Sequence, residues 1–567
     1  MASNFIKVIS DNILSPLGIT SEDNFSACRS GKYPIIQHGK AHERRMRDYI
    51  ENLLDKKLGD ISAEYTYFEK LAIISAREAV DKIKIDVSSD DVIFLLSTTK
   101  GNVELLENHP EDPRAYLSDS ANRIVSYFGN KNQPVIISNA CISGVCAQIV
   151  AVRQLLGTDA FRFAVVIGCD VLSDFIVSGF ESFKALSHEP CRPYDAKREG
   201  LNLGEAAATL ILEKTDCVVP GDVVYVNSSI HNDANHISGP SRTGEGAFRV
   251  LTDLLDTTDR KELAFISTHG TSTLYNDEME SIALHRARLD DIPISAVKSY
   301  YGHTLGAAGV LETILAIHAL KNNIVLPTAN YETPGTTWPL RIFKETEEVK
   351  SGSNSFFKIL SGFGGTNAGI SYRIIGQNRP SPLDKNNEKY EIAGEIKVSP
   401  AEIQLNSERC PGMSLNDAYR KFFNDYPKFF KMDGLSKLGF VSAGLLLKET
   451  PLSDIQKENT AIILFNNNGS LVTDRNYQRT LSPDNYFPSP ALFVYTLPNI
   501  VTGEIAIRHK IHGETSFYIA NTHSETDMDD IVTNMSNTYS PSAILTGWVE
   551  YENESNYLAK IKLLIKK

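Results

Sequence analysis

The sequence predicts an α/β fold with a mostly parallel sheet, and two observations carry this prediction. Short apolar segments at residues 91–96, 134–138 and 163–168 have the length and composition of buried strands. Predicted helices alternate with them: one over residues 66–82, where apolar side chains lie mostly on one side, comes before the first strand, and others near 120–128 and over 145–156 lie between the strands. Strands that alternate with helices form a parallel sheet whose faces are covered by those helices.

The composition is that of a soluble globular protein with more than one hydrophobic core. The chain has 567 residues, of which 42% are hydrophobic and 22% charged. Its seven scattered cysteines, without a CxxC pair, indicate a reducing compartment and argue against a disulfide framework or a zinc site. The net charge of -13 disfavours nucleic acid as a partner. We therefore expect a cytoplasmic protein with no metal site, and no signal peptide or membrane span is recognised.

Residues 134–148 form the stretch around which the first part of the chain is organised. A predicted strand runs into small residues around Cys141, and an apolar helix follows over residues 145–156. A cysteine at such a turn lies near the positive end of the helix dipole. This position lowers the thiol pKa from about 8.5 and favours a thiolate at neutral pH. On this stretch alone, a buried structural cysteine is the stronger interpretation.

Residues at the ends of three later strands favour a catalytic Cys141 over a structural one. His269 follows the strand at 264–268, and His303 comes shortly after the segment 294–296. The strand at 356–360 ends in the glycine-rich turn GFGGTNAG. Singly, each histidine could be a capping residue and the turn could serve only a positive φ. Because strand ends in α/β sheets collect catalytic loops, the combination with the cysteine indicates thioester chemistry.

These motifs resemble, in order, those of the decarboxylating β-ketoacyl-ACP synthases, the elongating condensing enzymes of fatty acid and polyketide synthesis. The matching segments are NACISG around Cys141, GCDVLSDF at 168–175, residues 185–213, HGTSTLYND at 269–277, the Lys298 segment, GHTLGAAG at 302–309 and GFGGTNA at 362–368. The resemblance covers residues 1 to about 375. It implies a thiolase-like domain of five layers, αβαβα, with halves at about 1–215 and 216–375.

Comparison with related families shows which class of condensing enzyme the chain resembles. Thiolases carry a second catalytic cysteine near the last glycine turn, and this chain has none there. Initiating synthases pair Cys and His with Asn, where this chain has His303. Chain-length factors lack the nucleophile, whereas Cys141 is present. The pattern is thus the Cys-His-His set of an elongating synthase, made of Cys141, His269 and His303.

The resemblance implies a role for each site residue. Cys141 would take the acyl group from an acyl-ACP thioester, and His269 and His303 would bind the enolate that forms when malonyl-ACP loses CO₂. The backbone N–H groups of Cys141 and Phe363 would hold the tetrahedral oxyanion, and Phe363 would also gate the site. The other implied roles are support of the histidines by Lys298 and Glu312, contact with the phosphopantetheine arm by Thr271 and Thr273, and docking of the acidic carrier protein by Arg198. Which histidine moves a proton is left open, and no cofactor beyond the carrier's phosphopantetheine is expected.

A second unit follows a polar, proline-containing linker at about residues 376–390. Residues 391–567 read as a partial repeat of the first half, because segments 460–470 and 517–524 parallel two of its strands with the turns that follow. His523 then takes the place of Cys141. We expect a smaller α/β half-thiolase-like domain without a nucleophile. It either packs against the synthase or a partner, as a chain-length factor does, or has only a stabilising role.

The sequence therefore predicts a β-ketoacyl-ACP synthase that catalyses decarboxylative Claisen condensation in fatty acid or polyketide-type biosynthesis, aryl polyene biosynthesis being one such pathway. The alternative is a non-catalytic chain-length-factor-like or scaffold subunit that kept the motifs, and the intact Cys-His-His set argues against it. Acyl carrier protein is the expected partner. The resemblance implies a dimer, either a homodimer or a heterodimer with a chain-length-factor-like subunit.

Overall fold

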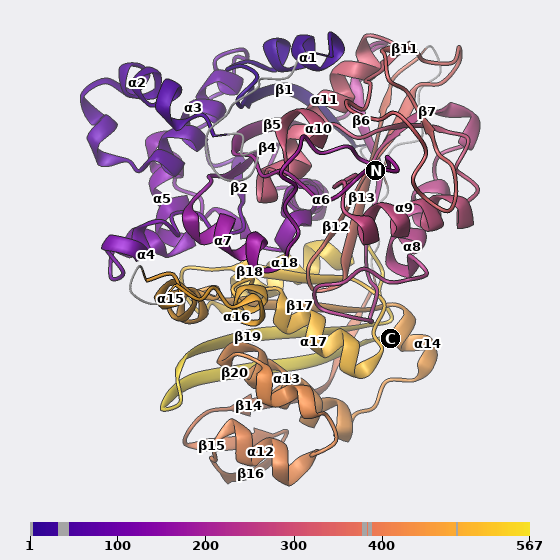
Figure 1. Ribbon diagram of the computed structural model, residues 1–567. Helices are drawn as coiled ribbons and strands as arrows, with labels where there is room; N and C mark the ends of the chain where they lie inside the picture. The colour runs from indigo at the N-terminus through magenta and orange to yellow at the C-terminus, as the bar shows by residue number, and fades with distance from the viewer. Residues whose placement is uncertain (1–3, 32–44, 377–382, 384–387, 483–485) are drawn as a thin grey trace.

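The first half of the chain forms a five-stranded mixed sheet. The structure is a computed structural model that describes residues 4–31, 45–376, 383, 388–482 and 486–567 (Figure 1). The strands lie in the order β1 (Phe5–Leu14), β5 (Ala206–Thr215), β4 (Phe163–Asp170), β2 (Val92–Ser97) and β3 (Val135–Ile137). The first two pairs are antiparallel and the last two are parallel. The prediction of a mostly parallel sheet is therefore correct only for β4, β2 and β3, and both faces of β4 and β2 are buried.

A second sheet repeats this topology. Its strands lie in the order β6 (Val223–Asn232), β13 (Thr366–Ile374), β12 (Ser355–Gly362), β7 (Leu263–Ser267) and β8 (Pro293–Ser295), with the short β10 (Arg341–Ile342) added to β8. Again two antiparallel pairs precede two parallel pairs. Two halves of equal topology are what a thiolase-like fold requires.

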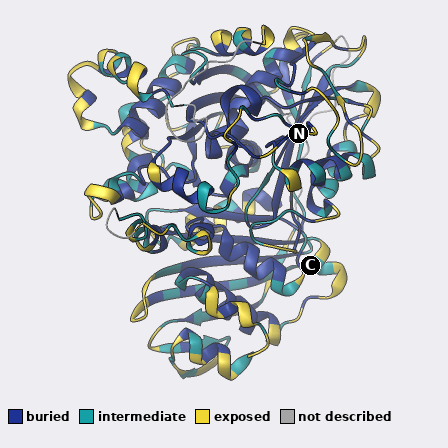
Figure 2. Ribbon diagram, viewed as in Figure 1, coloured by how far each residue is buried: buried dark blue, intermediate teal, exposed yellow. Residues whose placement is uncertain are grey.

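Two helices fill the space between the sheets. α6 (Ser143–Gly157) contacts β4 and β13, and α11 (Ala308–Lys321) contacts β5 and β12. α3 (Tyr67–Val80) covers the outer face of the first sheet and α8 (Glu245–Leu255) that of the second. Figure 2 shows the central elements buried and the outer helices exposed on their far sides. The layers are αβαβα, so the five-layer prediction is confirmed.

The apolar helix at Cys141 is part of this core. Among the described residues, one helical segment, Ala140–Gly157, has the length and hydropathy to cross a membrane, but 89% of it is buried inside the fold. Gly144 of α6 lies so close to α11 that a Cβ atom there would come within 2.8 Å of the Gly309 Cα. We therefore identify the segment as a core helix packed between two sheets.

The remaining elements connect these layers or belong to the C-terminal segment. The helices are α1 (Ser21–Arg29), α2 (Arg47–Leu58), α4 (Leu105–Asn108), α5 (Leu117–Tyr127), α7 (Asp174–Ser182), α9 (Leu274–Arg286), α10 (Lys298–Tyr301), α12 (Leu415–Phe422), α13 (Gly434–Glu449), α14 (Asp454–Glu458), α15 (Leu471–Arg479), α16 (Pro490–Tyr495), α17 (Ile500–His509) and α18 (Glu525–Ser536). The other strands are β9 (Ile324–Val325), β11 (Glu347–Glu348), β14 (Tyr390–Val398), β15 (Glu402–Leu405), β16 (Glu408–Pro411), β17 (Thr460–Asn466), β18 (Thr515–Ile519), β19 (Ala543–Asn553) and β20 (Asn556–Lys566). Most of the expected linker at 376–390 lies outside the described residues.

The C-terminal segment forms a third five-stranded sheet with the order β14, β20, β19, β17, β18. Its pairs are antiparallel, antiparallel, parallel and parallel, as in the first sheet. The glycines that follow the corresponding strands β2 and β17, Gly101 and Gly469, both have positive φ, at 51° and 58°. His523 lies between β18 and α18, and Cys141 lies between β3 and α6.

The two similar sheets join edge to edge. β18 pairs antiparallel with β3, with Tyr518 opposite Ile137 and Ile519 opposite Ile136. α18 packs beside α6 across the same boundary. An unpaired edge strand is a template for association with another chain. Here β18 pairs with β3, so the β3 edge of the first sheet is covered. Any dimer must therefore form through another face.

Buried ion pairs cross this boundary. Arg153 of α6 donates two hydrogen bonds, of 2.8 and 2.7 Å, to the carboxylate of Glu514. The two side chains are 7% and 1% exposed. Lys100 similarly meets Asp474 at 2.7 Å. Charges this deeply buried are tolerated only as pairs.

We predict that Glu514→Gln destabilises the protein strongly, because it leaves the Arg153 charge buried without a counter-ion. The expected loss in the free energy of unfolding is about 3–5 kcal/mol, measured by urea denaturation. The control is Glu213→Gln, which removes the partner of Arg162, a side chain that is 59% exposed, and should cost under about 1 kcal/mol. Equal losses in the two variants would contradict the prediction.

Candidate active site

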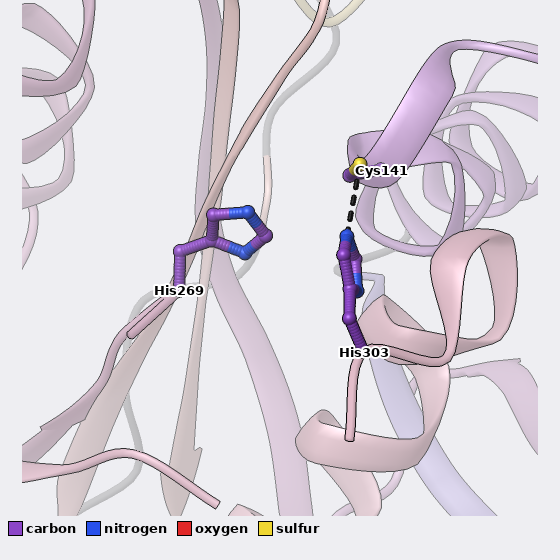
Figure 3. A group of neighbouring side chains, drawn as sticks. All are labelled: Cys141, His269 and His303. Carbon is purple, nitrogen blue, oxygen red and sulfur yellow. Dashed lines mark hydrogen bonds between the residues drawn. The ribbon is translucent and has the colours of Figure 1, made fainter. Parts of the chain in front are cut away.

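The structure brings Cys141, His269 and His303 together. Cys141 lies in a 3₁₀ turn, Ala140–Ile142, directly before α6. His269 follows β7, and His303 lies between α10 and α11. The Cys141 Sγ is 3.0 Å from the His303 Nε2, and one candidate ligand atom from each of the three residues lies within 4.8 Å of the other two. Figure 3 shows the side chains converging from three different elements.

The hydrogen bonds of His303 determine which nitrogen carries the proton. The backbone N–H of Leu305 donates to Nδ1 at 3.3 Å. Nδ1 is therefore the acceptor, and in a neutral ring Nε2 carries the hydrogen and donates it to the Cys141 sulfur. The Nδ1 of buried His269 has no hydrogen-bond partner within the described part of the chain. The site thus holds one imidazole in contact with the cysteine sulfur and one, His269, whose buried Nδ1 has no partner among the described residues.

Both histidines are neutral. Burial, together with the positive charges of Lys298 and Lys358, holds the pKa of His303 well below its usual value. Burial does the same to the pKa of His269, again with Lys298 and Lys358 as contributors. Neutral imidazoles can donate a hydrogen bond to an oxyanion without adding charge to the site.

The pKa of the Cys141 thiol differs from the expectation based on the sequence. Burial raises the pKa of the Cys141 thiol to about 12, against a smaller lowering by Lys298. The expectation of a lowered thiol pKa and a thiolate at neutral pH, drawn from the helix N-terminus, is therefore wrong. Desolvation of the charged form is the larger physical effect.

A buried carboxylate between two lysines lies behind the histidines. Lys298 donates to Glu312 Oε1 at 2.6 Å, and Lys358 donates to Glu312 Oε2 at 2.5 Å. Lys358 also donates to the backbone oxygen of Thr268 at 2.9 Å, directly before His269. Lys298 and Glu312 were expected beside the histidines from the sequence, whereas Lys358 was not. The available signal was a lysine in the middle of the apolar strand FFKIL.

Two further carboxylates shape the loop that carries His269. Glu280 accepts hydrogen bonds from the backbone N–H groups of His269 and Gly270, at 2.7 and 2.8 Å. Asp277 accepts from the N–H of Thr271 at 3.0 Å. Both acids were missed, although their spacing of three residues on the helix after HGTST puts them on one helix face.

A cavity of about 340 Å³ opens onto the three side chains. Thr271, Thr273 and Phe363 line it, and the two threonine hydroxyls lie 2.9 Å apart. The wall beside Phe363 is aromatic, with ring centroids 6.4 Å away for Phe180 and 5.7 Å for Phe183. An apolar wall next to the sulfur suits an acyl chain.

Arg198 does not lie where the resemblance placed it. It is 7% exposed, and its guanidinium donates to the backbone oxygens of Asp195, Gly335 and Leu274, at 3.0, 2.5 and 3.3 Å. A side chain committed to three carbonyls inside the protein cannot dock a carrier protein at the surface. Its role is to tie loops together beside the cavity.

Two family models match the chain. The model described as "Beta-ketoacyl synthase, N-terminal domain" matches residues 34–216, and "Beta-ketoacyl synthase, C-terminal domain" matches residues 223–332. Together they cover just over half of the 567 residues. Neither model extends into the C-terminal sheet.

Individual relatives and a solved structure are also ketosynthases by their names. The chain is 27% identical over 367 residues to "Putative polyketide beta-ketoacyl synthase 1" of Streptomyces cyaneus, which covers 57% of this chain and 85% of the relative. It is 35% identical over 217 residues to "3-oxoacyl-[acyl-carrier-protein] synthase 2" of Rhizobium meliloti, covering 35% of this chain and 50% of the relative. In fold it is similar to a structure titled "PfaC Keto synthase-Chain length factor", with a TM-score of 0.75 and 15% identity over 100% of this chain and 78% of the other.

We predict that alkylation of Cys141 by iodoacetamide accelerates steadily with pH. With the thiol pKa raised to about 12, the thiolate fraction and the rate should rise about tenfold per pH unit between pH 7 and 10. Peptide mass spectrometry would separate Cys141 from the exposed Cys217, whose rate is the internal control. A plateau for Cys141 near neutral pH would contradict the prediction.

We predict that Lys358→Met raises the pKa values of His269 and His303. The substitution removes a positive charge that lowers both. NMR titration of the imidazole C–H signals would measure the shift. Lys350→Met, at an exposed position, should leave both histidines unchanged, and an equal response in the two variants would contradict the electrostatic explanation.

Proposed function

The chain belongs to the β-ketoacyl synthase family, and from this premise we propose that it elongates an acyl group by decarboxylative condensation at Cys141. The observation that carries the proposal is the 3.0 Å approach of the His303 Nε2 to the Cys141 sulfur, in a cavity that His269 also lines. A non-catalytic subunit would not need this geometry. The Cys-His-His set can perform acyltransferase chemistry.

In the first half-reaction, Cys141 accepts the acyl group. Its sulfur attacks the thioester carbonyl, and the C–S bond to the phosphopantetheine breaks. The proton of the buried thiol ends on the departing phosphopantetheine sulfur, so no net charge enters the site. In our proposal the N–H groups of Cys141 and Phe363 bind the tetrahedral oxyanion, and each such donor contributes about 3–4 kcal/mol.

In the second half-reaction, a malonyl thioester replaces the first carrier. Its C–C bond to the carboxylate breaks, CO₂ leaves, and the electron pair forms an enolate. A ring N–H of His269 and the Nε2–H of His303 would stabilise the enolate oxygen. The enolate carbon then bonds to the acyl carbonyl, and the Cys141 sulfur leaves as a thiolate that takes up one proton from solvent. The products are a β-ketoacyl thioester, CO₂ and free enzyme.

The substrates are proposed to arrive on acyl carrier protein in the cytoplasm. This partner is supported by the carrier named in the Rhizobium meliloti relative and by the paired threonines that line the cavity. Because Arg198 is buried and bonded to backbone carbonyls, we propose that another residue docks the carrier. The pathway, with aryl polyene biosynthesis as one option, stays a prediction.

We predict that wild-type protein gains the mass of an acyl group when it is incubated with acyl carrier proteins that bear different acyl chains. Cys141→Ala should gain none, because the attacking sulfur is absent. Intact-mass spectrometry measures both, and the preferred chain indicates the pathway. If no carrier acylates the wild type, the scaffold interpretation is favoured instead.

A further inference from the structure

The turn that carries Phe363 depends on contacts from outside its own sheet. It joins β12 to β13, and two of its residues, Gly364 and Gly365, have φ values of 94° and 72°. Left-handed backbone of this kind is flexible unless its peptide groups are held. The position of Phe363 therefore depends on what binds the carbonyls of this turn.

One of these contacts comes from the C-terminal segment. Asn499, the N-cap residue of α17, is fully buried, and its Nδ2 donates to the Phe363 carbonyl at 2.8 Å. A Cβ on Gly364 would lie 2.7 Å from that Nδ2, and a Cβ on Gly503 of α17 would lie 2.7 Å from the Gly364 oxygen. The N-terminal turn of α17 thus packs directly on the turn, with glycine on both sides of the contact.

A second side-chain contact completes the arrangement. Asn232 Nδ2 donates to the Gly364 oxygen at 2.9 Å and to the Thr515 hydroxyl of the C-terminal segment at 3.0 Å. The Gly364 N–H donates to the Ile237 oxygen at 2.6 Å. Consecutive peptide groups are therefore held by amide side chains, and one of these comes from each part of the chain.

The amide of Asn499 is only half satisfied. Its Oδ1 has no hydrogen-bond partner among the described residues, although it is buried. A buried unsatisfied oxygen costs stability, so this side chain is a poor choice for fold stability alone. The specific contact that the Asn499 side chain makes is its hydrogen bond to the Phe363 carbonyl.

We propose that Asn499 is a positioning residue for the condensation reaction. By holding the Phe363 carbonyl it sets ψ of Phe363, and through it the direction of the aromatic ring and of the backbone N–H at the cavity. The C-terminal segment, which has no nucleophile of its own at His523, thereby takes part in the chemistry at Cys141. The inference rests on the proposed function.

The test compares Asn499→Ala and the near-isosteric Asn499→Asp, which lacks the donor, with the matched control Asn534→Ala. Asn534 is also a buried amide of the C-terminal segment, and it donates to Gln154 at 2.9 Å away from the cavity. Hydrogen–deuterium exchange of residues 362–366 reports on the turn. Acylation of Cys141 by an acyl-phosphopantetheine thioester reports on the reaction.

In both Asn499 variants we expect exchange at residues 362–366 to become faster. The acylation rate at saturating thioester should fall about 10- to 100-fold, as small misplacements at reacting centres do, while the thioester KM changes little. Iodoacetamide alkylation of Cys141 in these variants should stay at the wild-type rate, and Asn534→Ala should match the wild type in the exchange of residues 362–366 and in acylation.

Asn499 variants that match Asn534→Ala in both exchange and acylation would overturn the inference. So would faster exchange combined with wild-type acylation, because Asn499 would then hold the turn without effect on the reaction. If the wild type accepts no thioester but exchange responds to the Asn499 variants, the proposed function fails while the contact itself is supported.

Discussion

The close approach of α6 and α11 is the constraint on which the site depends. Gly144 and Gly309 meet where no side chain fits, since a Cβ on Gly309 would lie 2.3 Å from the Val145 nitrogen. Both helices begin at the cavity, one after the Cys141 turn and the other after the His303 turn. Packing the two helices backbone to backbone therefore places sulfur and imidazole in hydrogen-bond contact.

Charge balance behind the histidines keeps them in one protonation state. Glu312 binds Lys298 and Lys358 together behind the histidines. The positive charges of the two lysines and burial both oppose a proton on His269 or His303. Burial likewise raises the pKa of the Cys141 thiol, so the cysteine and both histidines are all in their neutral forms before substrate enters.

The C-terminal segment extends the first sheet and reaches the site. β18 continues the sheet at β3, and the Arg153–Glu514 pair fastens the boundary. The same segment brings α17 against the Phe363 turn. Its resemblance to the first half is thus structural, and its position relative to the catalytic half is set by sheet pairing and buried charge.

The sequence by itself determined the α/β class, the repeated topology and the Cys-His-His set, because strands and their end motifs are local patterns. It could not show Lys358 as part of the site, since a lysine in a buried strand acquires its meaning from the Glu312 opposite it. It misplaced Arg198 and the direction of the Cys141 pKa, because exposure and desolvation depend on packing. Asn499 reaches Phe363 across 136 positions of sequence, a contact that only the tertiary structure decides.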